Sequence, residues 1–236
     1  MTATKPTIVL VHGAFADSSS WTGVVSKLRE QGYPVVAAAN PLRGVESDAA
    51  YVADVVNGVD GPVVLAGHSY GGVLISRAAA ETPNVRALVY IAAFQPDNGE
   101  SVFELSGRFP GGKLGPDTTN VLVAQGNPEL SIKPEDFAEV FAADVPAETA
   151  AVMAVTQRPV AEQALGAAFD GVPAWTKLPS WALIANHDNA IPAAAQEFMA
   201  KRASSEITRI DASHAVSVSQ PGAVADVIVA AATHAA

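Results

Sequence analysis

Residues 63–72 read VVLAGHSYGG, and they are the most informative stretch of the chain. Residues 63–66 are all apolar, as in a parallel strand that is buried on both faces. Gly67-His68-Ser69-Tyr70-Gly71 then has the spacing of a sharp strand-to-helix turn, which holds a serine in strained backbone angles. Glycines are needed there because side chains two residues either side of Ser69 would collide. We predict that Ser69 is a nucleophile beside the positive end of a helix.

Strand-like and helix-like segments alternate on both sides of this turn. Apolar, mostly β-branched runs predict buried parallel strands at 8–11, 35–38, 63–66, 87–92, 180–185 and 206–210. Helices are predicted between or after them, at 21–31, 47–58, 71–82, 193–203 and 221–232. Gly32 stands just past the first helix, and Ser47-Asp48 would cap the second. Strands joined by helices of this length predict an α/β fold with a mostly parallel central sheet and helices on both faces.

The alternation breaks between about residues 95 and 173. This part has frequent Pro and Gly, short strand-like runs at 121–124 and 130–132, and several helical stretches. Pro134 and Pro146 stand where a first helical turn would begin. We predict a single domain over residues 1–236, with a cap inserted at about 95–173.

Composition excludes several classes of function. Fourteen Lys and Arg against 24 Asp and Glu give a net charge of −10, which argues against nucleic acid or an anionic membrane as partner. The chain has no cysteine, so a thiolate nucleophile, a disulfide and a cysteine-ligated metal are excluded. We find no signal-peptide pattern and no apolar run of bilayer length, and we therefore expect a cytoplasmic protein.

The strand at 8–11 is followed by His12-Gly13-Ala14-Phe15, a candidate oxyanion loop. Acyl transfer places negative charge on the former carbonyl oxygen, which preorganised backbone N–H groups stabilise. We expect one donor to be the N–H of Tyr70 and the other that of Ala14, in preference to Phe15. Gly13 would let the backbone approach closely, and His12 would hold the loop by hydrogen bonds.

A serine nucleophile needs a base, and the five histidines are the candidates. His12 and His68 flank the two loops already described, and His234 lies in the last few residues, where order is not expected. His214 follows the strand at 206–210, at the carboxyl end where a base belongs in this arrangement. His187 is then a pocket or structural residue.

The base in turn needs a carboxylate to orient it. Asp188 lies in the loop after the strand at 180–185, also at a carboxyl end, and is the favoured acid. Asp211 is its main rival, but it lies only three residues before His214; Asp170 belongs to the cap region.

Five stretches resemble a known family, and they occur in its order along nearly the whole chain: 9–21 (VLVHGAFADSSSW), 64–72 (VLAGHSYGG), 88–97 (LVYIAAFQPD), 188–192 (DNAIP) and 211–221 (DASHAVSVSQP). The chain resembles the α/β-hydrolase superfamily, in particular the branch of plant methylesterases, salicylate-binding esterases, hydroxynitrile lyases and their bacterial esterase relatives. The resemblance implies Ser69, Asp188 and His214 as a triad, with Ala14 and Tyr70 as oxyanion donors. It also implies an apolar acyl pocket beneath the cap, with no metal and no organic cofactor.

Two departures from the branch favour hydrolysis. The plant lyases carry Thr or Asn at the position of Gly13, and one lineage carries Lys at the position of Ala215. We therefore predict a serine hydrolase that cleaves a small, mostly apolar carboxylic ester through an acyl-enzyme on Ser69. A hydroxynitrile lyase, or a carbon–carbon hydrolase or perhydrolase with the same triad, is the alternative. A non-catalytic ligand binder is the alternative from another class, and a homodimer stays open as the assembly.

Aromatic residues and one histidine are the candidates for lining the pocket. Each candidate could equally well be a residue that packs the cap onto the core. Trp21, by contrast, is assigned to core packing. The candidates are Phe15, Phe94, Phe103, Phe137, Phe141, Trp175 and His187.

Overall fold

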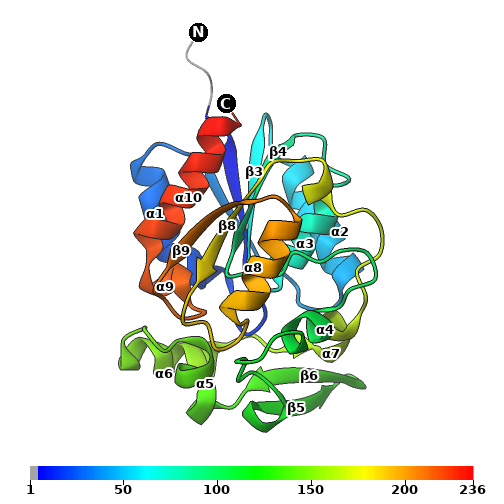
Figure 1. Ribbon diagram of the computed structural model, residues 1–236, viewed down its shortest axis with the longest axis vertical. Coiled ribbons are helices and arrows are strands. Elements are labelled where there is room, and N and C mark those ends of the chain that lie inside the picture. Colours follow the sequence, from blue (N-terminus) through cyan, green and yellow to red (C-terminus); the bar gives the residue numbers. More distant parts are fainter. Residues whose placement is uncertain (1–4, 236) are drawn as a thin grey trace.

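The computed structural model describes residues 5–235; residues 1–4 and 236, the two ends of the predicted domain, lie outside the described residues. Six strands form one parallel sheet in the order β2-β1-β3-β4-β8-β9 (Figure 1). Every one of them overlaps a predicted run. The strands are β1 (Thr7–Val11), β2 (Val35–Ala38), β3 (Val63–His68), β4 (Val85–Ile91), β8 (Ser180–Ala185) and β9 (Glu206–Ile210).

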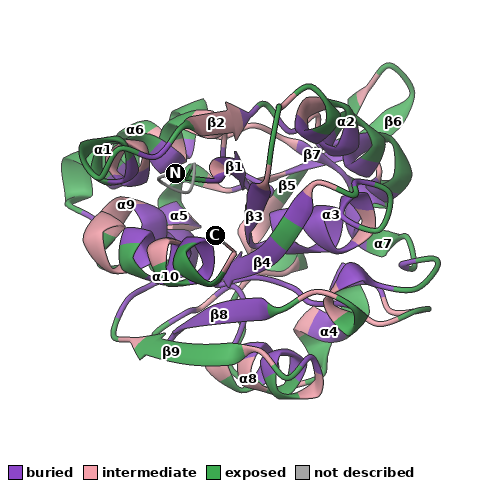
Figure 2. Cartoon of the chain, turned by 90° about the horizontal axis from the view of Figure 1, so that it is seen from above, coloured by how far each residue is buried: buried purple, intermediate pink, exposed green. Residues whose placement is uncertain are grey.

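Helices cover both faces of this sheet, as predicted (Figure 2). One face packs against α1 (Thr22–Glu30) and α10 (Pro221–His234), and the other against α2 (Val45–Asn57), α3 (Gly71–Ala78) and α8 (Ala193–Arg202). Side chains alternate along each strand, so Ile8 and Leu10 join the first layer, and Val9 and Val11 join the second. Within residues 5–235, no helix combines the length and the apolar character needed to cross a membrane.

Some helix ends differ from the prediction. Gly32 has a φ of 76° and ends α1 as predicted, since its N–H donates to Arg29 O at 2.9 Å. Helix α2 begins at Val45, so Ser47 and Asp48 lie inside its first turn and do not cap it as predicted. Helix α3 ends at Ala78, before the predicted end at residue 82.

His234 corrects a further expectation, because it does not lie in a disordered tail. It is the last residue of α10, and its ring centroid lies 5.3 Å from that of Trp181.

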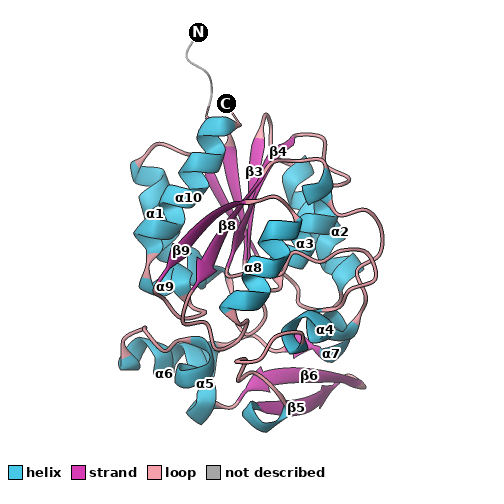
Figure 3. Cartoon of the chain, viewed as in Figure 1, coloured by secondary structure: helices cyan, strands magenta, loops and turns pink. Residues whose placement is uncertain are grey.

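Residues 95–173, here called the cap segment, lie beyond the carboxyl ends of the parallel strands (Figure 3). A second, antiparallel sheet has the order β5-β6-β7. The predicted runs at 121–124 and 130–132 belong to β5 and β6, whereas β7 was not predicted. The elements are α4 (Val102–Gly107), β5 (Thr119–Ala124), β6 (Asn127–Ile132), α5 (Pro134–Phe141), α6 (Ala147–Thr156), β7 (Val160–Ala161) and α7 (Glu162–Gly166). The cap segment also contains the 3-10 helix η2 (Pro116–Thr118), and short elements outside it are α9 (Val216–Ser219) and the 3-10 helices η1 (Ser18–Trp21) and η3 (Ala174–Thr176).

An ion-pair cluster fastens the start of the cap segment to α8. Both terminal nitrogens of Arg202 donate to Glu100 at 2.8 Å, and Arg108 donates to the same carboxylate at 2.8 Å. Partial burial raises the pKa of Glu100, but hydrogen bonds from Arg202, from Asp97 N–H and from Arg108 outweigh it and lower the pKa to about 2.

The depressed pKa of Glu100 predicts a pH-dependent contribution to stability. A carboxyl whose folded pKa lies below its unfolded value stabilises the fold above about pH 4.5, and this contribution is lost as pH falls towards 2. Glu100→Gln should therefore lower Tm at pH 7 by about 2–4 °C per kcal/mol lost, and the difference should shrink towards pH 3. Thermal unfolding at both pH values measures it, with Glu46→Gln in an exposed ion pair as control. A Tm difference that is constant with pH would contradict the expectation.

Candidate active site

Ser69 lies in the turn between β3 and α3, at the carboxyl end of its strand. Its φ is 53°, a left-handed conformation that is costly for any residue except glycine, so the predicted backbone strain is confirmed. A Cβ at Gly67 would lie 2.6 Å from the backbone of Gly71, and a Cβ at Gly71 would lie 2.5 Å from Val11 O. Both glycines are therefore required by close backbone approach.

His214 lies in the loop after β9 and is buried. Its Nδ1 lies 2.7 Å from Asp188 Oδ2, and its backbone carbonyl accepts a hydrogen bond from His68 Nε2 at 2.9 Å. The next residue, Ala215, donates its N–H to Phe141 O in the cap segment at 2.8 Å. Both the imidazole and its loop are thus fixed in position.

Asp188 follows β8 and meets four donors. Its Oδ1 accepts from the N–H groups of Ala190 and Ile191 at 2.8 and 2.7 Å. Its Oδ2 accepts from Gln196 Nε2 at 2.8 Å and faces Nδ1 of His214. A carboxylate surrounded in this way can only accept, so Nδ1 of His214 carries the proton and Nε2 is left with a lone pair.

The two rival carboxylates do not reach the histidine. The side chain of Asp211 is 78 % exposed and accepts a hydrogen bond from Asn186 at 2.7 Å. Asp170 is exposed in the cap segment. Among the residues described, the only acid that contacts the His214 ring is Asp188.

His68 and His12 are buried beside the site and hold its loops. Since a carbonyl cannot donate, His68 gives the proton of its Nε2 to His214 O, and His12 gives that of its Nδ1 to Gly13 O at 2.9 Å. Burial lowers the pKa of His12, and it lowers the pKa of His68 well below the usual range with a further contribution from nearby His214. The role of His12 in its loop was predicted, whereas the contact between His68 and His214 was not.

Backbone N–H groups beside Ser69, those of Ala14, Phe15 and Tyr70 among them, have no partner in the described part of the chain. The loop after β1 approaches so closely that a Cβ at Gly13 would lie 2.6 Å from the Cβ of Ser69. Unpaired donors next to a serine at the end of a strand form a suitable site for a developing oxyanion.

A cavity of about 670 Å³ joins Ser69 and His214 to the cap segment. Ala14 and Tyr70 also line it, as do three of the predicted pocket residues, Phe15, Phe94 and Phe103. Most other lining side chains are apolar and come from the cap segment, and the prediction had missed them. Examples are Val102, Phe109, Leu114, Val121, Leu130 and Leu165.

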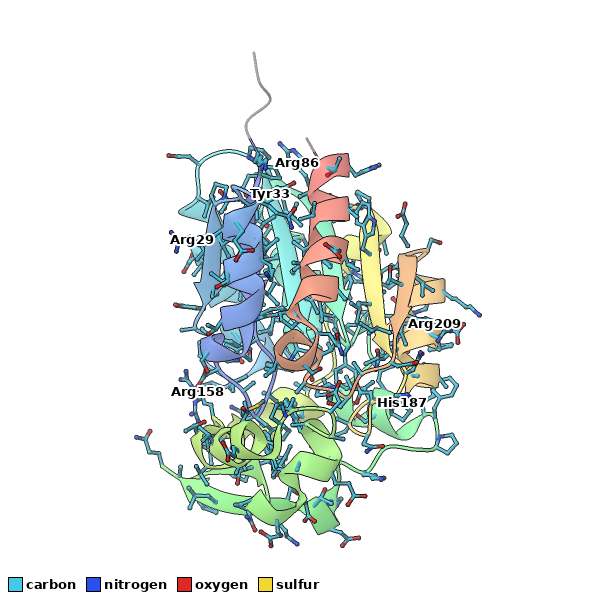
Figure 4. All side chains as sticks on the ribbon, turned by 90° about the vertical axis from the view of Figure 1, so that its left-hand side faces the viewer. Arg29, Tyr33, Arg86, Arg158, His187 and Arg209 are labelled. Atoms are coloured by element: carbon cyan, nitrogen blue, oxygen red, sulfur yellow. The ribbon has the colours of Figure 1, made fainter. Side chains whose placement is uncertain are left out.

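The other four predicted pocket residues do not line this cavity. Phe137 and Phe141 stack on each other at 5.1 Å in the core, and Phe141 also meets the His214 ring edge-on at 4.7 Å. Trp175 donates its indole N–H to Pro96 O at 2.9 Å. His187 is 70 % exposed and lies 3.6 Å from Asp211, at the surface (Figure 4).

Comparison with known proteins agrees with this architecture. A sequence model of the alpha/beta hydrolase family matches residues 8–227. The alpha/beta hydrolase nvfD of Aspergillus novofumigatus (strain IBT 16806) is 29% identical over 252 residues, which cover 95% of each chain. The predicted fold class is confirmed by these matches and by the six parallel strands.

Solved structures of a hydrolase and of a methylesterase share this fold. A pyrethroid hydrolase from Sphingobium faniae JZ-2 superposes with a TM-score of 0.80 at 25% identity over 98% of both chains. A methylesterase protein, MES16 from Arabidopsis, has a TM-score of 0.81 at 17% identity and covers 97% of this chain and 99% of its own. A plant methylesterase, a member of the branch that the sequence resembles, is thus among the proteins of similar structure.

Proposed function

The chain belongs to the alpha/beta hydrolase family, and we propose that it is a carboxylesterase-like serine hydrolase acting through an acyl-enzyme on Ser69. One observation carries the proposal: His214, oriented by Asp188 at 2.7 Å, and Ser69 line the same cavity as the unpaired N–H donors of Ala14 and Tyr70. Nucleophile, base and oxyanion donors thus face one apolar space, and the acid contacts the base from outside it. The similar alpha/beta hydrolase and the pyrethroid hydrolase support the same reaction class.

The mechanism follows from these positions. Nε2 of His214 takes the proton of Ser69 Oγ as that oxygen attacks the ester carbonyl, and the N–H groups of Ala14 and Tyr70 receive the oxyanion. The imidazolium, stabilised by Asp188, then protonates the leaving alcohol, and the acyl group stays on Ser69. Water that gives its proton to His214 attacks the acyl-enzyme, releasing the carboxylic acid and regenerating the serine.

The cavity indicates the class of ester. Its walls are mostly apolar, which favours a neutral, mostly apolar substrate. A volume of about 670 Å³ lies in the range that encloses a drug-sized ligand, so bulky acyl or alcohol groups fit as well as the small ester predicted from the sequence.

A p-nitrophenyl ester series from acetate to laurate tests the proposal. We expect turnover that varies with acyl length, together with an acyl adduct on the peptide containing Ser69 in quenched reactions. Cleavage of mandelonitrile without ester turnover would instead support the lyase alternative. Saturable ligand binding without any product would support the non-catalytic binder.

A cytoplasmic location and a homodimeric assembly stay predictions from the sequence. Cell fractionation and light scattering, respectively, would test them.

A further inference from the structure

A second buried carboxylate lies close to the nucleophile turn, and the mechanism above does not use it. Asp48, in the first turn of α2, is fully buried. It accepts hydrogen bonds from the Tyr70 hydroxyl at 3.0 Å, from Arg43 N–H at 2.9 Å and from Gly44 N–H at 3.2 Å. Within residues 5–235 no Lys or Arg side chain pairs with it. A buried carboxylate held only by neutral donors is costly, so its presence here calls for a reason.

Tyr70 connects this carboxylate to the proposed oxyanion site. Its N–H is one of the unpaired donors beside Ser69, and its hydroxyl, at the other end of the residue, donates a hydrogen bond to Asp48. Burial raises the pKa of the Tyr70 hydroxyl, and the charge of Asp48 adds to this, so the hydroxyl keeps its proton and donates. With the phenol fixed at one end and the strained Ser69 before it, the direction of the Tyr70 N–H is fixed.

Asn40 makes the corresponding contact with the other oxyanion loop. It is fully buried and donates from Nδ2 to the carbonyl of His12 at 2.9 Å, two residues before Ala14. Its Oδ1 accepts from Leu42 N–H at 3.2 Å. The chain from Asn40 to Asp48, here called the 40–48 segment, therefore touches both loops that carry the proposed oxyanion donors.

The 40–48 segment is itself held by the cap segment. Leu42 O accepts from Ala161 N–H of β7 at 2.9 Å, and Arg43 O accepts from Gln163 Nε2 at 2.9 Å. The Arg43 side chain also forms an ion pair with Glu129 of β6. Contacts on both sides make this segment a fixed support, and not a loop that is free to follow the oxyanion donors.

We propose that Asp48 is a positioning residue for the hydrolysis: through the Tyr70 hydroxyl it holds the Tyr70 N–H at the place where the oxyanion forms, while Asn40 supports the loop of Ala14. This inference rests on the proposed esterase function. Oxyanion donors act only when they are preorganised, and a shift of about 1 Å in an active-site group can cost roughly 100-fold in rate. Loss of the contact should therefore weaken binding of the transition state more than binding of the substrate.

Tyr70→Phe tests this with the smallest change, because it removes one hydroxyl and keeps the ring. We expect kcat on a p-nitrophenyl ester to fall about 10- to 100-fold with KM changed less than about threefold. Inhibition by an alkyl boronic acid, which adds to the serine and places an oxygen in the oxyanion site, should weaken in parallel with kcat/KM. Asp48→Asn should behave similarly, and the double variant should be little worse than the more impaired single variant.

Tyr90→Phe is the matched control, because Tyr90 is equally buried and its hydroxyl hydrogen-bonds to Ser76 at 2.8 Å, outside the cavity. It should lower Tm as much as Tyr70→Phe does while kcat stays at the parent value. Parent turnover of the ester tests the proposed function separately, before any variant is compared. If the parent is active but Tyr70→Phe and Asp48→Asn keep kcat and boronic acid affinity within about twofold while Tm falls, Asp48 is only structural and the inference is overturned.

Discussion

Ser69→Ala is expected to reduce kcat for ester hydrolysis by roughly 10⁴-fold or more. The substitution removes the only atom that forms the acyl bond, while the cavity and the N–H donors of Ala14 and Tyr70 stay in place. Substrate should therefore still bind, and the residual rate should be the little that the remaining groups supply. Initial rates on p-nitrophenyl butyrate, over the full range of protein concentration that solubility allows, measure the loss.

A second serine controls for loss of a buried hydroxyl. Ser180 begins β8, at the end of the sheet away from the site, and its hydroxyl hydrogen-bonds to Ser205 at 2.8 Å. Ser180→Ala should keep the parent kcat, and a fluorophosphonate probe should label it and the parent but not Ser69→Ala. Undiminished turnover by Ser69→Ala would show that the nucleophile is another group.

The central sheet could be predicted because its information is local. Each strand is a short apolar run between turn signals, and Gly67 and Gly71 mark the turn of Ser69, where the backbone approaches too closely for a side chain. Parallel strands end at the same edge of a sheet, so residues just after strands, such as Asp188 and His214, were expected to meet. Their side chains do meet, with 2.7 Å between Asp188 Oδ2 and His214 Nδ1.

The cap segment was less predictable because its structure depends on distant partners. Strand β7 has only two residues and exists through its pairing with β6, about thirty residues earlier in the chain. The sequence does carry a signal for the hairpin of β5 and β6, because a glycine stands in its two-residue turn. Gln125 and Gly126 adopt φ of 50° and 83° there, as a tight hairpin turn requires. Three consecutive residues of β5, however, are apolar and exposed, so the sequence shows no apolar–polar alternation from which a buried face of this strand could be predicted.

The same difficulty explains the errors about the pocket. Aromatic type alone predicted Phe137 and Phe141, but the orientation of α5 turns both into the core against the loop of His214. The contact between Asp48 and Tyr70 was likewise out of reach, because Asp48 reads as a helix cap in the sequence and its partner lies 22 positions away.

Asp188→Asn is expected to lower kcat by about 10⁴-fold with little change in the shape of the site. The two backbone donors on Oδ1, from Ala190 and Ile191, should retain the amide oxygen of the new side chain on their side. Its NH₂ group must then face Nδ1 of His214, where a donor has replaced an acceptor. The imidazole can accept that hydrogen bond only by moving its own proton to Nε2, and the nitrogen that faces the cavity is then no longer a base.

A variant of the rival carboxylate, Asp211, distinguishes a change of the His214 tautomer from a general effect of losing one negative charge. Asp211→Asn makes the same chemical change three residues before His214, at a side chain that is 78 % exposed and contacts Asn186 and His187. Its kcat should stay within about twofold of the parent, because a surface charge is screened by solvent. Asp188→Asn should bind substrate with nearly unchanged KM, since the defect lies in proton transfer and not in the cavity. Equal losses in the two variants would instead indicate that the loop of His214 responds to charge as a whole, and the assignment of Asp188 as the orienting acid would be wrong.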